Sequence, residues 1–87
     1  MFLTKAIMTK LTLTPAELQS AIQAEVNAIR EVVADGANVV VSLPYWHEVD
    51  GNGANWAIAT VRNMRGYEGA VVKIIDKYRE LYNLPNA

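Results

Sequence analysis

The chain has 87 residues, of which 52% are hydrophobic and 20% are charged, and it contains no cysteine. This length predicts one small domain, and the apolar content is too high for a disordered chain. Without cysteine, neither a disulfide nor a thiolate metal site can stabilise the fold. A formal net charge of −1 gives no general attraction to nucleic acid or to anionic lipid.

Residues 1–13 lack the features of a signal peptide, because the apolar run between Lys5 and Lys10 is very short and has no small-residue cleavage site. Polar and apolar residues alternate at 10–13, so we expect either a short N-terminal strand or an unstructured arm. Charged residues interrupt every apolar run before it reaches the roughly 20 residues that cross a bilayer. We therefore expect a soluble protein in the cytoplasm, without a membrane partner.

The single domain is expected over residues 14–87, and its first element is a helix. Thr14 and Glu17 have the spacing of a capping box, and Pro15 occupies the first helical position. The helix is predicted over about 15–34 and stops at Asp35-Gly36, where glycine accepts a left-handed conformation. Apolar residues recur at helical spacing on one side and polar residues fall on the other: Leu18, Ile22, Val26, Ile29 and Val33 against Gln19, Gln23, Asn27, Arg30 and Glu31.

Two strands follow, over about 38–49 and 54–62, because both segments are rich in β-branched and aromatic residues. The turn sequence at 50–53, Asp-Gly-Asn-Gly, joins them as a hairpin. If Gly51-Asn52 is the tip of the turn, His47 faces Trp56 and Tyr45 faces Ile58. Another turn type would shift this register.

A second helix is predicted over about 67–83, ending before Pro85. Its apolar stripe has helical spacing and consists of Tyr67, Val71, Ile74, Ile75, Tyr78, Leu81 and Tyr82. The fold class is therefore α+β, with the order α-β-β-α, a hairpin packed with two amphipathic helices and an alternative extra strand at the N-terminus.

Both faces of the predicted hairpin are mostly apolar, whereas a face turned to water carries polar residues. One face carries Val39, Val41, Leu43, Tyr45, His47, Val49, Trp56, Ile58 and Thr60. The other carries Val40, Ser42, Pro44, Trp46, Ala57, Ala59 and Val61. Since two helices do not easily cover both faces, we predict a homodimer or larger oligomer that uses the second face or an open strand edge. The alternative is a monomer with one helix on each face.

The most suggestive chemical motif is His47-Glu48-Val49-Asp50, which offers metal ligands or an acid and base. Strand alternation places His47 and Glu48 on opposite faces, which argues against a compact ligand set. The chain has one histidine, so no two-histidine zinc pattern exists. We interpret His47 as a structural residue beside Trp56, and we predict no catalytic residue, no metal site and no cofactor.

The basic residues Arg62, Arg65, Lys73 and Lys77 are the candidates for contact with nucleic acid, at a strand end and on the second helix. Their acidic neighbours and the overall charge favour a solvated helix face instead. Glu25 lies at the edge of the first helix's apolar stripe and is expected to reach water, with an ion pair to Arg62 of another subunit as the functional alternative.

The leading hypothesis is a non-enzymatic, intracellular protein-interaction or regulatory module that acts as a homo-oligomer and whose partner is another protein or its own copy. Its size alone suits a bacterial or phage accessory protein. The interface candidates are Trp46, Val40, Pro44 and Val61, with Trp46 foremost because tryptophan is enriched at binding hot spots. The second hypothesis is a nucleic-acid-binding regulator, and the third is an enzyme or metal site around His47, Glu48 and Asp50.

Overall fold

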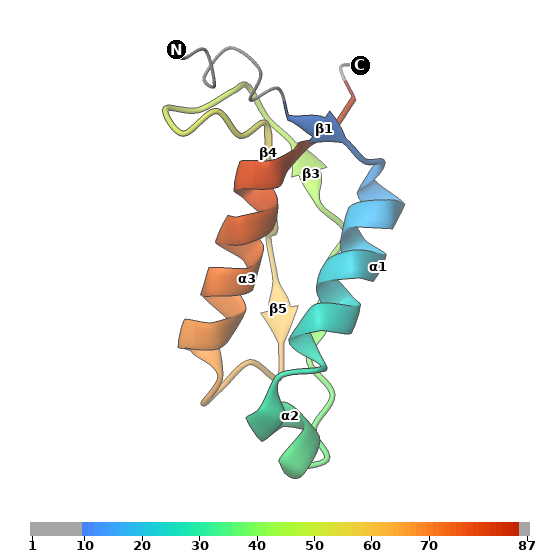
Figure 1. The fold of residues 1–87 in the computed structure, drawn as a ribbon, viewed down its shortest axis with the longest axis vertical. Coiled ribbons are helices and arrows are strands. Elements are labelled where there is room, and N and C mark those ends of the chain that lie inside the picture. Colours follow the sequence, from blue (N-terminus) through green and yellow to red (C-terminus); the bar gives the residue numbers. More distant parts are fainter. Residues whose placement is uncertain (1–9, 86–87) are drawn as a thin grey trace, which may run out of the picture.

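Two long helices lie side by side over short paired strands in the computed structural model, which describes residues 10–85 (Figure 1). Three helices and a few short strands make this a small α+β domain, the class that the sequence predicts. Its elements are β1 (Leu11–Thr12), α1 (Pro15–Val26), α2 (Arg30–Ala34), β2 (Val40–Val41), β3 (Tyr45–Trp46), β4 (Trp56–Ala57), β5 (Val61–Arg62), α3 (Glu68–Leu81) and β6 (Tyr82–Asn83).

The start of α1 is built as its sequence predicts. The Thr14 side chain accepts a hydrogen bond from the Glu17 N–H at 3.2 Å, and Glu17 Oε1 accepts one from the Thr14 N–H at 2.9 Å. These two bonds satisfy two backbone donors that a helix start otherwise leaves to water. Within α1 the face predicted to be apolar is the buried one, with Leu18, Ile22 and Val26 fully inaccessible to solvent, but Val33, predicted on the same face, is 62% exposed and Val32 is buried instead.

The helix expected over about 15–34 is interrupted after Val26, and α2 is a separate short helix. The interruption follows from Asn27, whose side-chain amide donates to the Val39 carbonyl at 2.8 Å while its oxygen accepts from the Val39 N–H at 2.9 Å. Ile29 then adopts an extended ψ of 131°, and the chain turns into α2. Gly36 ends α2 with a φ of +63°, the left-handed conformation expected there.

The hairpin register differs by one residue from the one predicted with Gly51-Asn52 as the tip. Trp46 pairs with Trp56 and Tyr45 with Ala57, so His47 does not face Trp56. The turn closes with the Asp50 N–H bonded to the Ala54 carbonyl at 2.9 Å, which leaves three residues in the loop instead of two. The next bond joins the His47 N–H to the Asn55 carbonyl, so Glu48 and Val49 are extra residues in the first arm, and these two features together set the observed register.

The ladder between the two arms of the hairpin is also interrupted around Pro44. The Ser42 N–H bonds the Thr60 carbonyl, and the His47 N–H bonds the Asn55 carbonyl. In a regular antiparallel ladder, the hydrogen-bonded residues of one strand are an even number of positions apart, whereas Ser42 and His47 are an odd number apart. The side that faces the core therefore changes along both arms. Buried positions run Val39, Val41, Pro44 in one arm, and buried or half-buried positions run Trp56, Ile58, Val61 in the other.

This change overturns the prediction that the helices bury the face that includes Leu43, Tyr45 and Val49, because these three apolar members are exposed. Leu43 is 52% exposed, Tyr45 is 50% exposed and Val49 is 63% exposed. A single alternation continued through Pro44 assigns these residues to the core, and the break at Pro44 moves them to the surface.

The two ends of the described segment meet in a parallel pair. Leu11 of β1 pairs with Tyr82 of β6, and Thr12 pairs with Asn83. Residues 11–12 thus form a short strand, one of the two alternatives for the N-terminal segment, while residues 1–9 lie outside the described residues. The second helix ends at Leu81, where Tyr82 takes an extended conformation.

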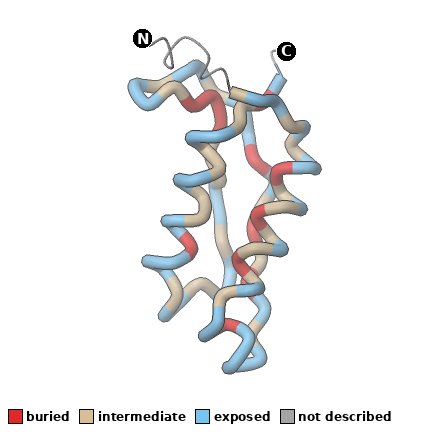
Figure 2. The backbone as a smooth tube through the Cα atoms, viewed as in Figure 1, coloured by how far each residue is buried: buried red, intermediate tan, exposed pale blue. Residues whose placement is uncertain are grey.

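One core lies between α1, α3 and the strands (Figure 2). Most of the predicted stripe of α3 packs against this core, but Leu81 is 50% exposed. No helix within residues 10–85 combines the length and apolarity needed to cross a membrane. The buried members of the core are Leu18, Ile22, Val26, Val32, Val39, Val41, Trp56, Val71 and Leu84.

Candidate functional site

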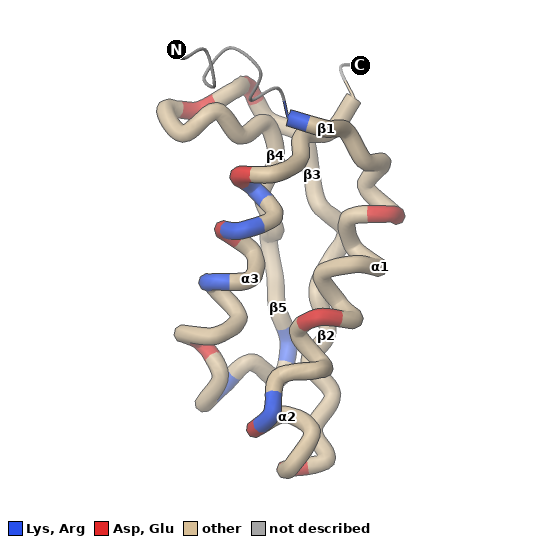
Figure 3. Tube along the Cα trace, in the orientation of Figure 1, with Lys and Arg blue, Asp and Glu red and all other residues tan. Residues whose placement is uncertain are grey.

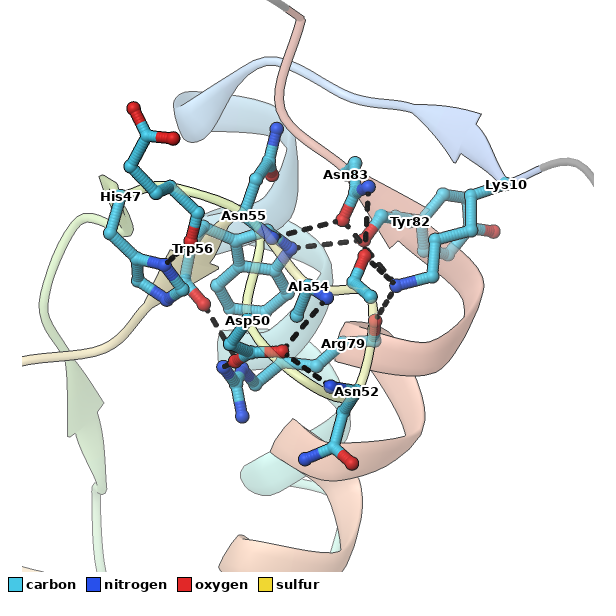
Figure 4. A network of polar contacts seen from close by, with 12 residues as sticks. Lys10, His47, Asp50, Asn52, Ala54, Asn55, Trp56, Arg79, Tyr82 and Asn83 are labelled. Carbon is cyan, nitrogen blue, oxygen red and sulfur yellow. Dashed lines mark hydrogen bonds and ion pairs between the residues drawn. The ribbon is translucent and has the colours of Figure 1, made fainter.

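Asp50 is the centre of a polar network at the tip of the hairpin (Figure 4). Its Oδ1 accepts hydrogen bonds from the N–H groups of Asn52 at 2.9 Å and Ala54 at 3.2 Å. Its Oδ2 accepts from Arg79 Nη2 at 2.6 Å. These backbone bonds, followed by the guanidinium, hold the pKa of Asp50 below its usual range. Both carboxylate oxygens are therefore used in holding the turn.

Arg79 and Trp56 connect the hairpin to the end of α3 and to β6. Arg79 Nε donates to the Trp56 carbonyl at 3.0 Å, and the indole Nε1 of Trp56 donates to the Tyr82 carbonyl at 3.0 Å. Trp56 is fully buried, so its N–H needs this partner. The indole is consequently a structural group.

Two asparagines complete the connection between the hairpin and β6. The Asn55 side chain donates to the Leu84 carbonyl at 3.0 Å and accepts from the Leu84 N–H at 2.9 Å. Asn83 Oδ1 accepts from the Asn55 N–H at 3.2 Å, and Asn83 Nδ2 donates to the Gly53 carbonyl at 3.1 Å. Each amide thus replaces a strand partner that the backbone lacks at these positions.

Lys10 joins the same network from the N-terminal side. Its ammonium donates to the carbonyls of Gly53 at 2.8 Å and Arg79 at 2.7 Å, and it lies 3.5 Å from Asn83 Oδ1. Burial lowers the pKa of Lys10 despite the nearby Asp50 carboxylate. A cation at the C-terminal end of a helix also suits the helix dipole.

This network, which we call the tip network, contains Lys10, Asp50, Asn55, Trp56, Arg79 and Asn83 and accounts for its own polar groups. Within residues 10–85 no buried side-chain nitrogen or oxygen lacks a hydrogen-bond partner. Sequence reasoning missed Asn55 and Asn83, although amides among apolar residues are a signal of buried hydrogen bonding. The arrangement is suited to holding the fold.

His47 and Glu48 are not assembled into a chemical site. His47 Nδ1 lies 2.5 Å from the Glu48 carbonyl, and the imidazole meets the Tyr45 ring edge-on at 6.2 Å between centroids, not the indole of Trp56. Glu48 is exposed. In the part of the chain that the structure describes, no three histidine, aspartate or glutamate side chains are grouped as metal ligands.

The four interface candidates do not share one surface. Trp46 is 46% exposed, Val40 and Val61 are half-buried, and Pro44 is buried. Trp46 instead belongs with the exposed apolar residues of the same hairpin arm. We call this set the hairpin surface, and its members are Leu43, Tyr45, Trp46 and Val49.

A groove that sequence reasoning did not anticipate runs between the second hairpin arm and α3. Its volume is about 350 Å³, and its lining is mostly apolar. A second depression of about 300 Å³ shares Asp76 and Arg79 with it and adds Glu80. The groove is lined by Ala57, Ile58, Ala59, Val61, Met64, Val72, Ile75, Asp76 and Arg79.

The basic candidates for nucleic-acid binding are divided. Lys77 forms an ion pair with Glu25, which also accepts from the Tyr78 hydroxyl at 2.9 Å. These bonds lower the pKa of Glu25, while burial and the bond to Glu25 raise the pKa of Tyr78 to about 12. Glu25 therefore connects α1 to α3, and basic and acidic residues alternate along α3 (Figure 3). Arg62, Arg65 and Lys73 are exposed.

No family model, curated protein or solved structure matches the chain.

Proposed function

We propose that this protein is a non-enzymatic protein-interaction module that acts as a homo-oligomer. The observation that carries the proposal is the hairpin surface, where four large apolar side chains within seven residues are between 46% and 63% exposed. Single exposed apolar residues are ordinary on a protein surface, but a concentration of them indicates an interaction site. Two of the four are Tyr45 and Trp46, residue types enriched at binding hot spots.

The energetics favour a binding role for these residues over a structural one. Complete burial of a large apolar side chain contributes about 1.5–3 kcal/mol, so the exposed halves of Tyr45 and Trp46 leave about half of that unrealised in the monomer. Because Tyr45 and Trp46 are successive residues of β3 and point to opposite faces, a partner gains both contributions only if it surrounds this hairpin arm. The nucleic-acid and metal-site hypotheses rest on charged residues that are less available to a ligand, because Lys77 and Asp50 are already held in ion pairs.

The test is a comparison of the double variant Tyr45→Ala/Trp46→Ala with the wild-type chain. Truncating two hot-spot residues weakens partner binding by about thirtyfold or more, which corresponds to at least 2 kcal/mol. The measurement is quantitative affinity capture from cell extract with full-length protein, after circular dichroism has shown that both proteins are folded.

The matched control is Val33→Ala, because Val33 is 62% exposed but lies on α2, away from the hairpin. The proposal requires that the control captures the same protein as wild type and that the double variant loses it. Equal capture by all three proteins would refute a binding role for the hairpin surface.

A further inference from the structure

The two outer strand edges of the hairpin are in different states. On the β2 side, the backbone of Val39 and Val41 is occupied by side-chain amides of α1. Gln23 accepts from the Val41 N–H at 2.7 Å and donates to the Val39 carbonyl, and Gln19 donates to the Val41 carbonyl at 3.0 Å. An edge covered in this way cannot accept another strand.

The β5 side remains open. Within residues 10–85 no hydrogen bond uses the N–H or C=O of Ile58 or Ala59. Thr60, just before β5, and Arg62 are the residues bonded toward the β2 arm, so the backbone groups of Val61 point to the outer edge. Ala59 and Val61, two residues apart, thus present backbone donors and acceptors to the same incoming strand.

The groove lies directly beside this open edge. Its other wall is a single stripe of α3, formed by Val72, Ile75, Asp76 and Arg79 at spacings of three, one and three residues. Val72 is 49% exposed, so an added strand finds an apolar surface beneath it as well as free backbone groups beside it. Strand addition at a sheet edge uses this combination.

The charges at the two ends of the groove are opposite in sign. Asp76 and Glu80 line the depression near the hairpin tip, while Arg62 ends β5 and Arg65 follows it at the other end. None of these four side chains takes part in an ion pair within the described residues. Arg79, which lies between them, is neutralised by Asp50.

We infer that the occupant of this edge is a second copy of the chain, paired antiparallel through β5. The symmetric register that uses both outward-facing residues pairs Ala59 with Val61 of the second copy, and the two-fold axis passes Thr60. This inference rests on the proposed function, which includes a homo-oligomer, and it identifies the surface through which the copies associate. The hairpin surface then stays free for another protein.

Charge complementarity identifies the second copy. Antiparallel pairing brings Arg62 and Arg65 of each copy toward Asp76 and Glu80 of the other, and the two-fold axis makes this contact twice. A standard interface covers about 800 Å² per partner, which is roughly a seventh of the 5761 Å² surface of the chain.

The experiment uses two full-length charge variants and measures association by sedimentation velocity from low to high micromolar concentration. Asp76→Lys/Glu80→Lys makes both ends of the groove basic, and Arg62→Glu/Arg65→Glu makes both ends acidic. Each variant alone is expected to sediment as a monomer, because like charges now meet. An equimolar mixture is expected to form a heterodimer, because every contact is again between opposite charges.

A backbone variant and a control complete the test. Ala59→Pro removes an N–H that is unbonded in the monomer but needed between the two copies, so it weakens the dimer at least about tenfold while circular dichroism stays unchanged. Glu31→Lys changes the charge of an exposed residue on α2 and leaves the dimer intact.

Three outcomes would overturn the inference. The first is a wild-type chain that is monomeric at high concentration, and the second is a mixture of the charge variants that stays monomeric. The third is a dimer that Tyr45→Ala/Trp46→Ala dissociates and Ala59→Pro does not, which would place self-association on the hairpin surface. Capture through the hairpin surface is measured separately with Ala59→Pro, so a failed dimer does not decide the interaction role.

Discussion

Asp50 illustrates how a single residue that resembles a chemical group is used for structure. Its carboxylate accepts two N–H groups of its own turn and the guanidinium of Arg79, which follows it by 29 residues. A carboxylate that accepts several hydrogen bonds is favoured in its charged form, and for this reason its pKa is low. Asp50 of the His47-Glu48-Val49-Asp50 motif is therefore a structural residue of the turn.

The depressed pKa predicts how acid affects stability. An unfolded aspartate has a pKa of about 3.9, so between that value and the lower folded pKa the unfolded chain binds more protons. The contribution of Asp50 is complete above about pH 4 and is lost as the pH falls through the folded pKa. Asp50→Asn should lower the melting temperature by several degrees at pH 7, and the difference from wild type should shrink toward pH 2.

Calorimetry or circular dichroism melts at both pH values provide the measurement. Glu48→Gln is the control, because Glu48 is an exposed neighbour whose side chain makes no hydrogen bond within residues 10–85. A wild-type-to-Asn difference that stays constant from pH 7 to pH 2 would contradict the role assigned to the Asp50 carboxylate.

At the scale of elements, α1 controls the hairpin through its polar side. Gln19, Gln23 and Asn27 each follow a residue of the fully buried stripe, so they lie about 100° around the helix from it and are half-buried. Their amides bind the backbone of β2 and replace a neighbouring strand. The helix therefore packs with one side and closes a strand edge with another, which leaves β5 as the open edge.

Among these residues we expect Gln23 to contribute most to stability, because its side chain both donates a hydrogen bond to this hairpin arm and accepts one from it. Gln23→Ala leaves the Val41 N–H without its partner, so we expect a loss of about 1–3 kcal/mol in the free energy of unfolding. Urea denaturation measures this loss. Ser20→Ala on the exposed side of the same helix should change stability by less than about 0.5 kcal/mol, and equal losses in both variants would show that the amide contact is unimportant.

At the scale of the whole molecule, the two ends of the described chain close the fold together. β1 pairs with β6, Lys10 binds the last turn of α3, and Leu84 is buried beneath the hairpin. The tip network thus unites segments from the beginning, middle and end of the chain. Because the core is small, stability depends on this closure more than it would in a larger domain.

Ending the chain after Leu81 should abolish cooperative folding. The truncation removes buried Leu84, at about 2–5 kcal/mol, and leaves the Asn55 amide and the Trp56 indole without their partners, at about 1–3 kcal/mol each. These losses equal the whole expected stability of about 4–13 kcal/mol for a chain of this length. A chain ending after Pro85 keeps every contact described above and is the matched control. Two-state thermal melting of the shorter chain would contradict the prediction.

Features set by neighbours in the sequence were predictable. The capping box, the buried stripe of α1, the position of the turn at 50–53 and the left-handed Gly36 each depend on residues within a few positions of one another. The candidate site was predictable only in part. Trp46 is exposed as expected, but Tyr45 was assigned to the core, and the groove beside α3 was not anticipated.

The amino-acid sequence by itself determined the α+β class, the start of α1 and the place of the hairpin, because local hydrogen bonding and periodicity control these features. Only the tertiary structure decided the break at Asn27, the change of face at Pro44, the hairpin register and which strand edge stays open. The break at Asn27 and the choice of open edge depend on partners 12 and 18 residues away, as the Asn27–Val39 and Gln23–Val41 bonds show. No local pattern reports such a partner, since the contact exists only once the core has brought the two segments together.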